Sequence, residues 1–273
     1  MNVIAPGRLP NCDILIFTST TTEKEELESA AAELNLPYAR LPTPLKARDL
    51  GEIQGSRVLA VHNRRMGSFG GGAAAANAIV AQAQSGATIL IGLGMAFGTL
   101  PAEQRIGDVL VSTSAVTYDD RTVVEGGPGR FRSIYDDEVF YPANAIMLNL
   151  LRQEADRRGH QGVWFGTLLT GGAAIQCGAF RDLLTRELSI VVERRTSNTG
   201  CIIGGEMEVS DLISASASDK PLWVVVKGLS DFADEARAWM PRQELAANRT
   251  AACRNAARFL LSALQNFQPG RNL

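Results

Sequence analysis

Short apolar runs recur along the chain and alternate with longer segments in which apolar and polar residues are mixed. Each run has about the length of one strand, and uninterrupted apolar runs are typical of parallel strands that are buried on both faces. The mixed segments between the runs predict helices. We expect strands at 13–18, 57–62, 88–92, 107–112, 164–169 and 223–228, and an apolar pair at 202–203 that introduces a helix starting near 208. One further helix begins near 23, one ends near 84, and two cover 145–158 and 246–264.

This alternation of strands and helices, with no internal repeat, is typical of the α/β class. We expect a single three-layer α/β/α domain spanning residues 1–273, built on a central, mixed but mostly parallel twisted sheet. Residues 94–98 are bracketed by glycines and predict a loop after the strand at 88–92. Residues 118–140 are polar and rich in turn-forming residues, so they predict a surface loop. Nothing along the chain indicates a boundary between domains.

Composition narrows the class of function. The chain has 273 residues, of which 45% are hydrophobic, and a net charge of −2, so no basic face for nucleic acid is expected. The apolar runs are too short to span a bilayer, and no apolar leader opens the chain. The four cysteines are widely spaced, which favours reduced thiols and neither a disulfide frame nor a metal site. We therefore expect a cytoplasmic protein without metal or cofactor that binds a small molecule.

Three carboxylates, those of Glu23, Glu208 and Asp231, come just after predicted strands. Ligands of open α/β sheets bind at this carboxyl edge. Carboxylates gathered in a cleft transfer protons, and cleavage at the anomeric carbon of a sugar needs both an acid and a base. Each residue also has a structural interpretation, because acidic residues favour the first turn of a helix or cap it. The spacing of Thr22 and Glu25 predicts a capping box.

Two motifs resemble a known family. Residues 205–208 (G-E-M-E), followed by 227–234 (K-G-L-S-D-F-A-D), are similar to the V-E-M-E and R-x-I-S-D-x-A-D of the methylthioadenosine/S-adenosylhomocysteine nucleosidases, a branch of the nucleoside phosphorylase superfamily. Residues 94–98, 106–112 and 141–144 also resemble family segments. The resemblance extends from about residue 13 to residue 264.

The resemblance implies a role for each carboxylate. Asp231 is the general acid that protonates purine N7, Glu23 positions and activates the attacking water, and Glu208 accepts hydrogen bonds from the ribose hydroxyls. Met207 packs on the ribose face. The remaining substrate contacts implied by the resemblance come from Met95, Ala96, Ile175, Glu206, Ser230 and Tyr141.

The segment around Glu23 favours water over phosphate as the attacking group. The phosphorylases of the superfamily carry a glycine-rich loop with an arginine at this point, whereas this chain has T-S-T-T-T-E at 18–23. The chain also departs from the nucleosidases, with Gly172, Ala174 and Met95 in place of an aspartate, an aromatic residue and a serine. We therefore expect a purine nucleoside or nucleotide N-glycosidase and leave the 5′ substituent open.

Three alternatives remain open at this stage. One is a phosphorylase that holds phosphate with Arg64 or Arg65, beside a glycine-rich stretch at 67–72 that could cradle an anion. Another is an ATP- or AMP-cleaving nucleosidase, similar to anti-phage effectors, with Arg130 and Arg132 on the phosphates. The third is a nucleoside sensor without catalysis. The resemblance further implies a homo-oligomer, with a dimer first, in which Tyr141 reaches a neighbouring site.

Overall fold

A computed structural model describes residues 7–63, 73–196, 200–216 and 222–266. Its strands and helices alternate along most of the chain, as the sequence predicts. The strands are β1 (Ile14–Thr18), β2 (Ala39–Arg40), β3 (Arg48–Ile53), β4 (Ser56–His62), β5 (Ile89–Gly98), β6 (Val109–Thr117), β7 (Thr122–Gly127), β8 (Arg130–Ile134), β9 (Phe140–Pro142), β10 (Val163–Thr170), β11 (Ile202–Glu206) and β12 (Leu222–Asp231). The helices are α1 (Thr21–Glu33), α2 (Ala73–Ser85), α3 (Ala145–Arg157), α4 (Gly178–Arg195), α5 (Val209–Ser216), α6 (Glu235–Trp239) and α7 (Arg242–Gln265).

The central sheet is mixed, which confirms the predicted fold class. Its strands run in the order β11-β10-β6-β12-β5-β1-β4-β3-β2, and β9 pairs with β6. The pairs β1–β4, β1–β5, β5–β12, β6–β10 and β10–β11 are parallel. In addition, β11 pairs antiparallel with β5, so five strands of the sheet curl into a closed ring.

Glycines allow this closure, which the sequence did not predict. Where β11 crosses β5, a Cβ on Gly204 would meet the carbonyl of Phe97, and a Cβ on Gly205 would meet the Phe97 ring. The two backbones can therefore approach only because these positions lack side chains. Irregular register in β10 and β12 adds to the bending.

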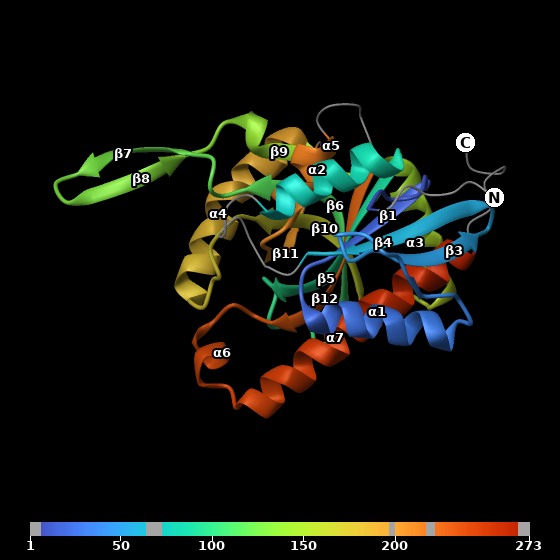
Figure 1. Ribbon diagram of the computed structural model, residues 1–273. Coiled ribbons are helices and arrows are strands. Elements are labelled where there is room, and N and C mark those ends of the chain that lie inside the picture. The colour runs from blue at the N-terminus through green and yellow to red at the C-terminus, as the bar shows by residue number, and fades with distance from the viewer. Residues whose placement is uncertain (1–6, 64–72, 197–199, 217–221, 267–273) are drawn as a thin grey trace.

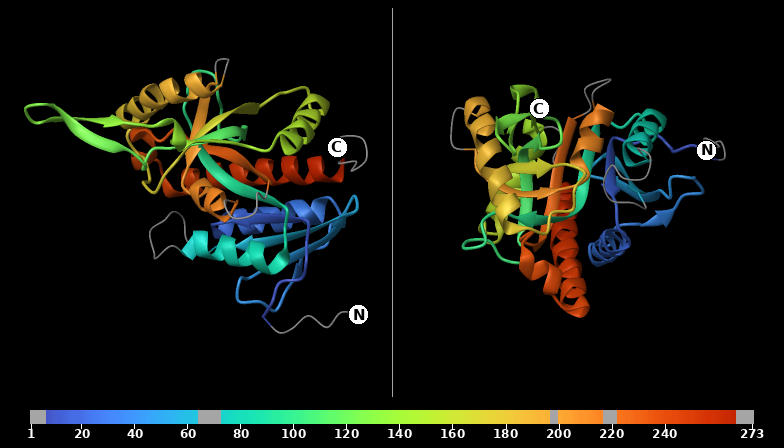
Figure 2. Two further views of the ribbon diagram at one scale, coloured as in Figure 1. Left: turned by 90° about the horizontal axis from the view of Figure 1, so that it is seen from above. Right: turned by 90° about the vertical axis from the view of Figure 1, so that its left-hand side faces the viewer.

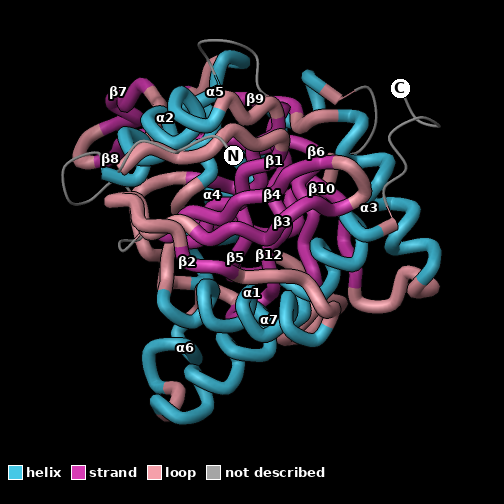
Figure 3. Tube along the Cα trace, turned by 45° about the vertical axis from the view of Figure 1, so that its right-hand side comes forward, coloured by secondary structure: helices cyan, strands magenta, loops and turns pink. Residues whose placement is uncertain are grey.

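Helices cover both faces of the sheet (Figures 1–3). On one face α1 and α3 pack against the long helix α7, and on the other α2 packs against α5. Alternate strand residues face the two layers, so Ile91 and Val224 belong to the first hydrophobic cluster and Leu90 and Val225 to the second. Within the described part of the chain, every helix is too short or too polar to cross a membrane.

Residues 118–140 are more ordered than the predicted surface loop. They form the β7–β8 hairpin, which projects away from the rest of the fold (Figures 1 and 2), and a 3₁₀ turn at Asp137–Val139. The connection between β7 and β8 contains Gly129 in the left-handed region, at φ +69°. Pairing of the two strands supplies the backbone hydrogen bonds that a free loop would leave to water.

Other elements also differ from the prediction. Residues 94–98 and 229–231 continue β5 and β12, because the partner strands extend equally far and pair with them. The capping box joins Thr20 and Glu23, two residues before the predicted pair. Helices α4 and α6 and strands β2, β3 and β9 were not predicted from the sequence, and α7 begins at Arg242, four residues before its predicted start.

Candidate active site

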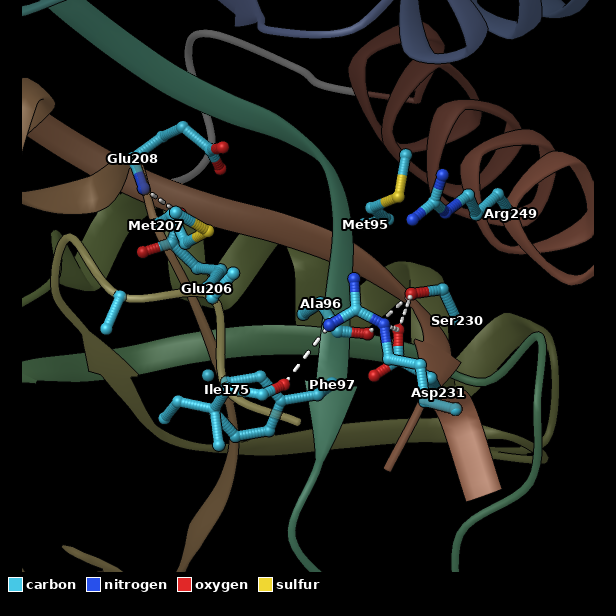
Figure 4. A pocket seen from close by; sticks show the side chains of 14 residues that line it. Met95, Ala96, Phe97, Ile175, Glu206, Met207, Glu208, Ser230, Asp231 and Arg249 are labelled. Atoms are coloured by element: carbon cyan, nitrogen blue, oxygen red, sulfur yellow. Dashed lines mark hydrogen bonds and ion pairs between the residues drawn. The ribbon is translucent and has the colours of Figure 1, made fainter. Parts of the chain in front are cut away.

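A cavity lies where β5, β11 and β12 meet (Figure 4). The carboxyl-terminal halves of β5 and β12 form one wall, and β11 with the turn that follows it forms another. Residues 173–175, which follow β10, and two arginines complete the lining. The lining residues are Met95, Ala96, Phe97, Ala173, Ala174, Ile175, Gly205, Glu206, Met207, Glu208, Ser230, Asp231, Arg237 and Arg249.

Asp231 is the last residue of β12 and is 6% exposed. Its Oδ1 accepts a hydrogen bond from the backbone N–H of Ala233 at 3.0 Å, and its Oδ2 accepts one from the hydroxyl of Ser230 at 3.0 Å. The Nε of Arg237 lies 3.3 Å from the same Oδ2. The carboxylate is therefore held in one orientation at the wall of the cavity.

Lys227 connects the acidic residues on the other side of the site. Its Nζ donates to Glu208 at 2.8 Å and lies 3.4 Å from Glu206. Burial alone would lower the pKa of Lys227, but the carboxylates of Glu208, Glu206 and Glu23 outweigh burial and raise the pKa above its ordinary value. The lysine therefore stays charged and fixes the position of Glu208.

Glu206 is buried and caps the start of α5. Its carboxylate accepts from the backbone N–H groups of Glu208 at 2.8 Å and Val209 at 3.0 Å. Burial raises the pKa of Glu206 to about 7, against the opposing charge of Lys227. Its side chain thus organises the turn that carries Met207 and Glu208 into the cavity.

Glu23 serves as both a helix cap and a neighbour of the site. One carboxylate oxygen accepts from the backbone N–H groups of Ser19 at 2.6 Å and Thr20 at 2.8 Å, and the other from that of Met95 at 3.1 Å. Gly94 lies so close that a Cβ there would overlap the carboxylate. Burial raises the pKa of Glu23, and Lys227 opposes this rise.

A second, smaller cavity adjoins the first, because Glu208 lines both. Ser19, Asn63 and Lys227 supply its other polar walls. The Oδ1 of Asn63 is buried and has no hydrogen-bond partner among the described residues. Glu208 therefore stands between two hollow regions, at the point where a bound molecule could extend from one into the other.

The fold brings most of the sequence-predicted site residues together. The residues that line the main cavity as expected are Met95, Ala96, Ile175, Glu206, Met207, Glu208, Ser230 and Asp231. Glu23 adjoins it through its hydrogen bond to Met95. Tyr141 instead lines a separate hollow with Thr117 and Thr170. Arg130 and Arg132 lie on the projecting β8, and Arg64, Arg65 and the stretch 67–72 lie outside the described residues.

Three further residues, Phe97, Arg237 and Arg249, line the cavity and were not predicted from the sequence. Phe97 was placed in a loop, although its apolar neighbours could have indicated that β5 continues. Arg237 comes six residues after Asp231, and Arg249 lies in the first turns of α7, three residues after the predicted start of that helix. Neither arginine belongs to a motif. Nothing in the sequence except their position downstream of Asp231 indicates that these arginines belong to the site.

The described residues contain no group of three or more histidine, cysteine, aspartate or glutamate side chains arranged to hold a metal ion. All four cysteines are free thiols. The cavity thus offers carboxylates, guanidinium groups, a hydroxyl and apolar surface. This set suits binding of a flat, partly polar molecule and the transfer of a proton to it.

Comparison with known proteins identifies the family. A sequence model described as the phosphorylase superfamily matches residues 14–265. The chain belongs to the phosphorylase superfamily. This membership confirms the family that the two motifs indicated and, with it, an enzyme of that superfamily. No curated protein matches the chain.

Several solved structures share the fold. Futalosine hydrolase of Helicobacter pylori strain 26695 superposes with a TM-score of 0.71 at 15% identity, covering 93% of this chain and 98% of that one. A 5′-methylthioadenosine/S-adenosylhomocysteine nucleosidase from Neisseria meningitidis, in complex with methylthio-immucillin-A, gives 0.68 at 16% identity, covering 93% and 99%. An S-adenosylhomocysteine nucleosidase from Streptococcus pyogenes, bound to 5-methylthiotubericidin, gives 0.67 at 18%, covering 96% and 99%.

Proposed function

We propose that this phosphorylase-superfamily protein hydrolyses the bond between the base and the ribose of a purine nucleoside. The observation that carries the proposal is the convergence of Asp231, Glu208 and Glu23, from three distant segments, around one cavity and its wall. The structural relatives named above include nucleosidases, which supports the same reaction class.

Each of the three carboxylates has a different role in the proposed reaction. Asp231 meets the base and gives a proton to purine N7, so that the base leaves as a neutral molecule. Glu208, fixed by Lys227, accepts hydrogen bonds from the ribose hydroxyls, and Met207 packs against the sugar. Holding the sugar in one orientation removes part of the entropic barrier to reaction. Glu23 directs the attacking water from the side of Met95, and its raised pKa suits acceptance of a proton.

Water is favoured over phosphate because the backbone N–H groups that could bind an anion already donate hydrogen bonds to Glu23. Backbone N–H groups at the start of a helix attract anions. In this chain, those of Ser19 and Thr20, together with that of Met95, donate to the carboxylate of Glu23. A phosphate at the same place would lose these donors and meet a buried acidic side chain. Hydrolysis avoids both costs.

The test is release of free base from purified protein, with and without phosphate, in the presence of adenosine, inosine, methylthioadenosine, AMP and ATP. Release without phosphate supports the proposal. Dependence on phosphate would make the protein a phosphorylase, and preference for AMP or ATP would make it a nucleotide nucleosidase. Binding of a nucleoside without any turnover would make it a sensor.

The variant Asp231→Asn tests the role of the acid. It should reduce turnover by about 10²- to 10⁴-fold, because it removes general acid catalysis, while binding of the nucleoside is retained. Asp136→Asn is the matched control, since Asp136 is exposed and its side chain caps nothing. Equal turnover by the two variants would contradict the assignment of Asp231.

A further inference from the structure

Arg237 occupies the edge of the cavity beside the proposed acid. Its Nε lies 3.3 Å from Oδ2 of Asp231, and its Nη1 donates to the backbone carbonyl of Ile175 at 3.1 Å. The dashed lines in Figure 4 include the contact at Ile175. The side chain is 14% exposed, and its Nε has no hydrogen bond of good geometry to any described residue. A guanidinium with unused donor capacity therefore borders the cavity at Asp231.

The chemistry of a purine puts a second group next to that guanidinium. N7 and the substituent on carbon 6 lie side by side on the same edge of the ring, so a protein that contacts one also meets the other. If Asp231 engages N7, the neighbouring Arg237 faces the 6-substituent. An arginine can only donate hydrogen bonds. A 6-oxo group accepts them, whereas a 6-amino group presents its own N–H donors.

The other polar groups at this end of the cavity also bear on the choice between a 6-oxo and a 6-amino group. The carbonyl of Ile175 already accepts from Arg237, so only its second lone pair is left for a 6-amino group. Arg249, which also lines the cavity, has a buried Nε without a partner among the described residues. The hydroxyl of Ser230 is directed at Ala96 and Asp231. Arg237 and Arg249 thus both bring donors without a hydrogen-bond partner among the described residues to the lining of the cavity.

We infer that the protein selects 6-oxopurine nucleosides, of the inosine and guanosine type, over 6-aminopurine nucleosides, and that Arg237 determines this specificity. The inference rests on the proposed function and names its substrate class. A 6-oxo group completes the hydrogen bonding of Arg237, whereas a 6-amino group leaves a buried donor facing another donor. One such matched contact is worth about 10- to 100-fold in discrimination.

The experiment compares kcat/KM for inosine and adenosine, with purine riboside, which lacks a 6-substituent, as the reference. For the natural protein, inosine should exceed adenosine by about 10- to 100-fold. In Arg237→Gln, whose side-chain carbonyl can accept from an amino group, the ratio of inosine to adenosine should fall at least tenfold. Arg242→Gln, on the exposed start of α7, is the control and should keep the natural ratio.

Equal or faster cleavage of adenosine by the natural protein would overturn the inference, and so would an unchanged ratio in Arg237→Gln. If that variant is inactive on all three nucleosides, calorimetric binding of hypoxanthine and adenine replaces the kinetic ratio, with the same expected change. Release of no base by the natural protein would refute the proposed function alone. The binding ratio of the two free bases would still decide the inference.

Discussion

Replacing Lys227 by methionine should destabilise the fold strongly and in a pH-dependent way. Lys227→Met keeps a side chain of similar length and removes the charge at the centre of the acidic cluster. The lysine is 2% exposed, and its Nζ lies 2.8 Å from Glu208 and 3.4 Å from Glu206. At an effective dielectric constant of about 20, point charges at these distances attract by about 6 and about 5 kcal/mol.

The cost of burying the lysine offsets part of that attraction, so the net loss is smaller than the sum. Removing one partner of a buried ion pair typically costs about 3–5 kcal/mol, because the other charge stays buried without compensation. We therefore expect the free energy of unfolding of Lys227→Met to fall by about 3–5 kcal/mol above neutral pH. Such a loss is a large fraction of the stability of a typical domain.

The pH dependence follows from Glu206. Its pKa in the folded protein is about 7, above the ordinary value of 4.5, so the folded state holds the proton more tightly than the unfolded state. The stability that this proton contributes is present at acid pH and is lost as the pH rises through the folded pKa. Without Lys227, that pKa rises further, so the loss continues above pH 7. The difference in the free energy of unfolding between the natural protein and Lys227→Met should therefore increase from pH 6 to pH 9.

The assay is urea denaturation at pH 6, 7.5 and 9, followed by tryptophan fluorescence. Lys24→Met is the control, because Lys24 is partly exposed on α1, and it should change stability by less than about 0.5 kcal/mol. A loss below about 1 kcal/mol in Lys227→Met, or an equal loss at pH 6 and pH 9, would refute the reasoning.

Three further predictions address other parts of the molecule. The natural protein should lose stability relative to Glu206→Gln as the pH rises from about 5 to 7, in urea titrations at each pH, and a constant difference would contradict the raised pKa of Glu206. Gly94→Ala should overlap the Glu23 carboxylate, cost about 1–3 kcal/mol and slow base release, whereas Gly126→Ala on β7 has room and should do neither. Light scattering at micromolar concentration should give at least the mass of a dimer, and the mass of one chain would exclude a homo-oligomer.

The sequence predicted the elements whose signal is local. The strands at 13–18 and 57–62 needed only their apolar runs, and they agree with β1 and β4. The glycine-rich stretch at 94–98 was predicted as a loop because glycine is unfavourable in an isolated strand. In the fold it pairs along its length with β12, and its small residues allow β11 to cross it closely. That requirement depends on partners far away in the chain and has no local signal.

The site residues likewise include some that a local sequence signal predicts and some that have no such signal. Asp231 ends β12 and Glu208 follows β11, so their place at the sheet edge could be predicted from the order of elements. Arg237 and Arg249 could not be predicted, because they reach the cavity from α6 and α7, which follow the motif without being part of it. Lys227 was recognised only as a motif residue. Its central place among three carboxylates appears only when β11 and β12 are brought together by the curled sheet.

Glu23 shows why a structural and a catalytic interpretation of one residue need not exclude each other. Its position in the first turn of a helix suggested a capping role, and Glu23 does complete the capping box with Thr20. The same hydrogen bonds keep the carboxylate pointing back from the helix toward β5, where Met95 donates to its second oxygen. A glutamate that positions water must be held rigidly, and a helix N-terminus supplies both the donors and the favourable dipole for this. The cap is therefore part of the means by which the fold could place a base, and a residue that only capped α1 would not need Gly94 and Met95 shaped around it.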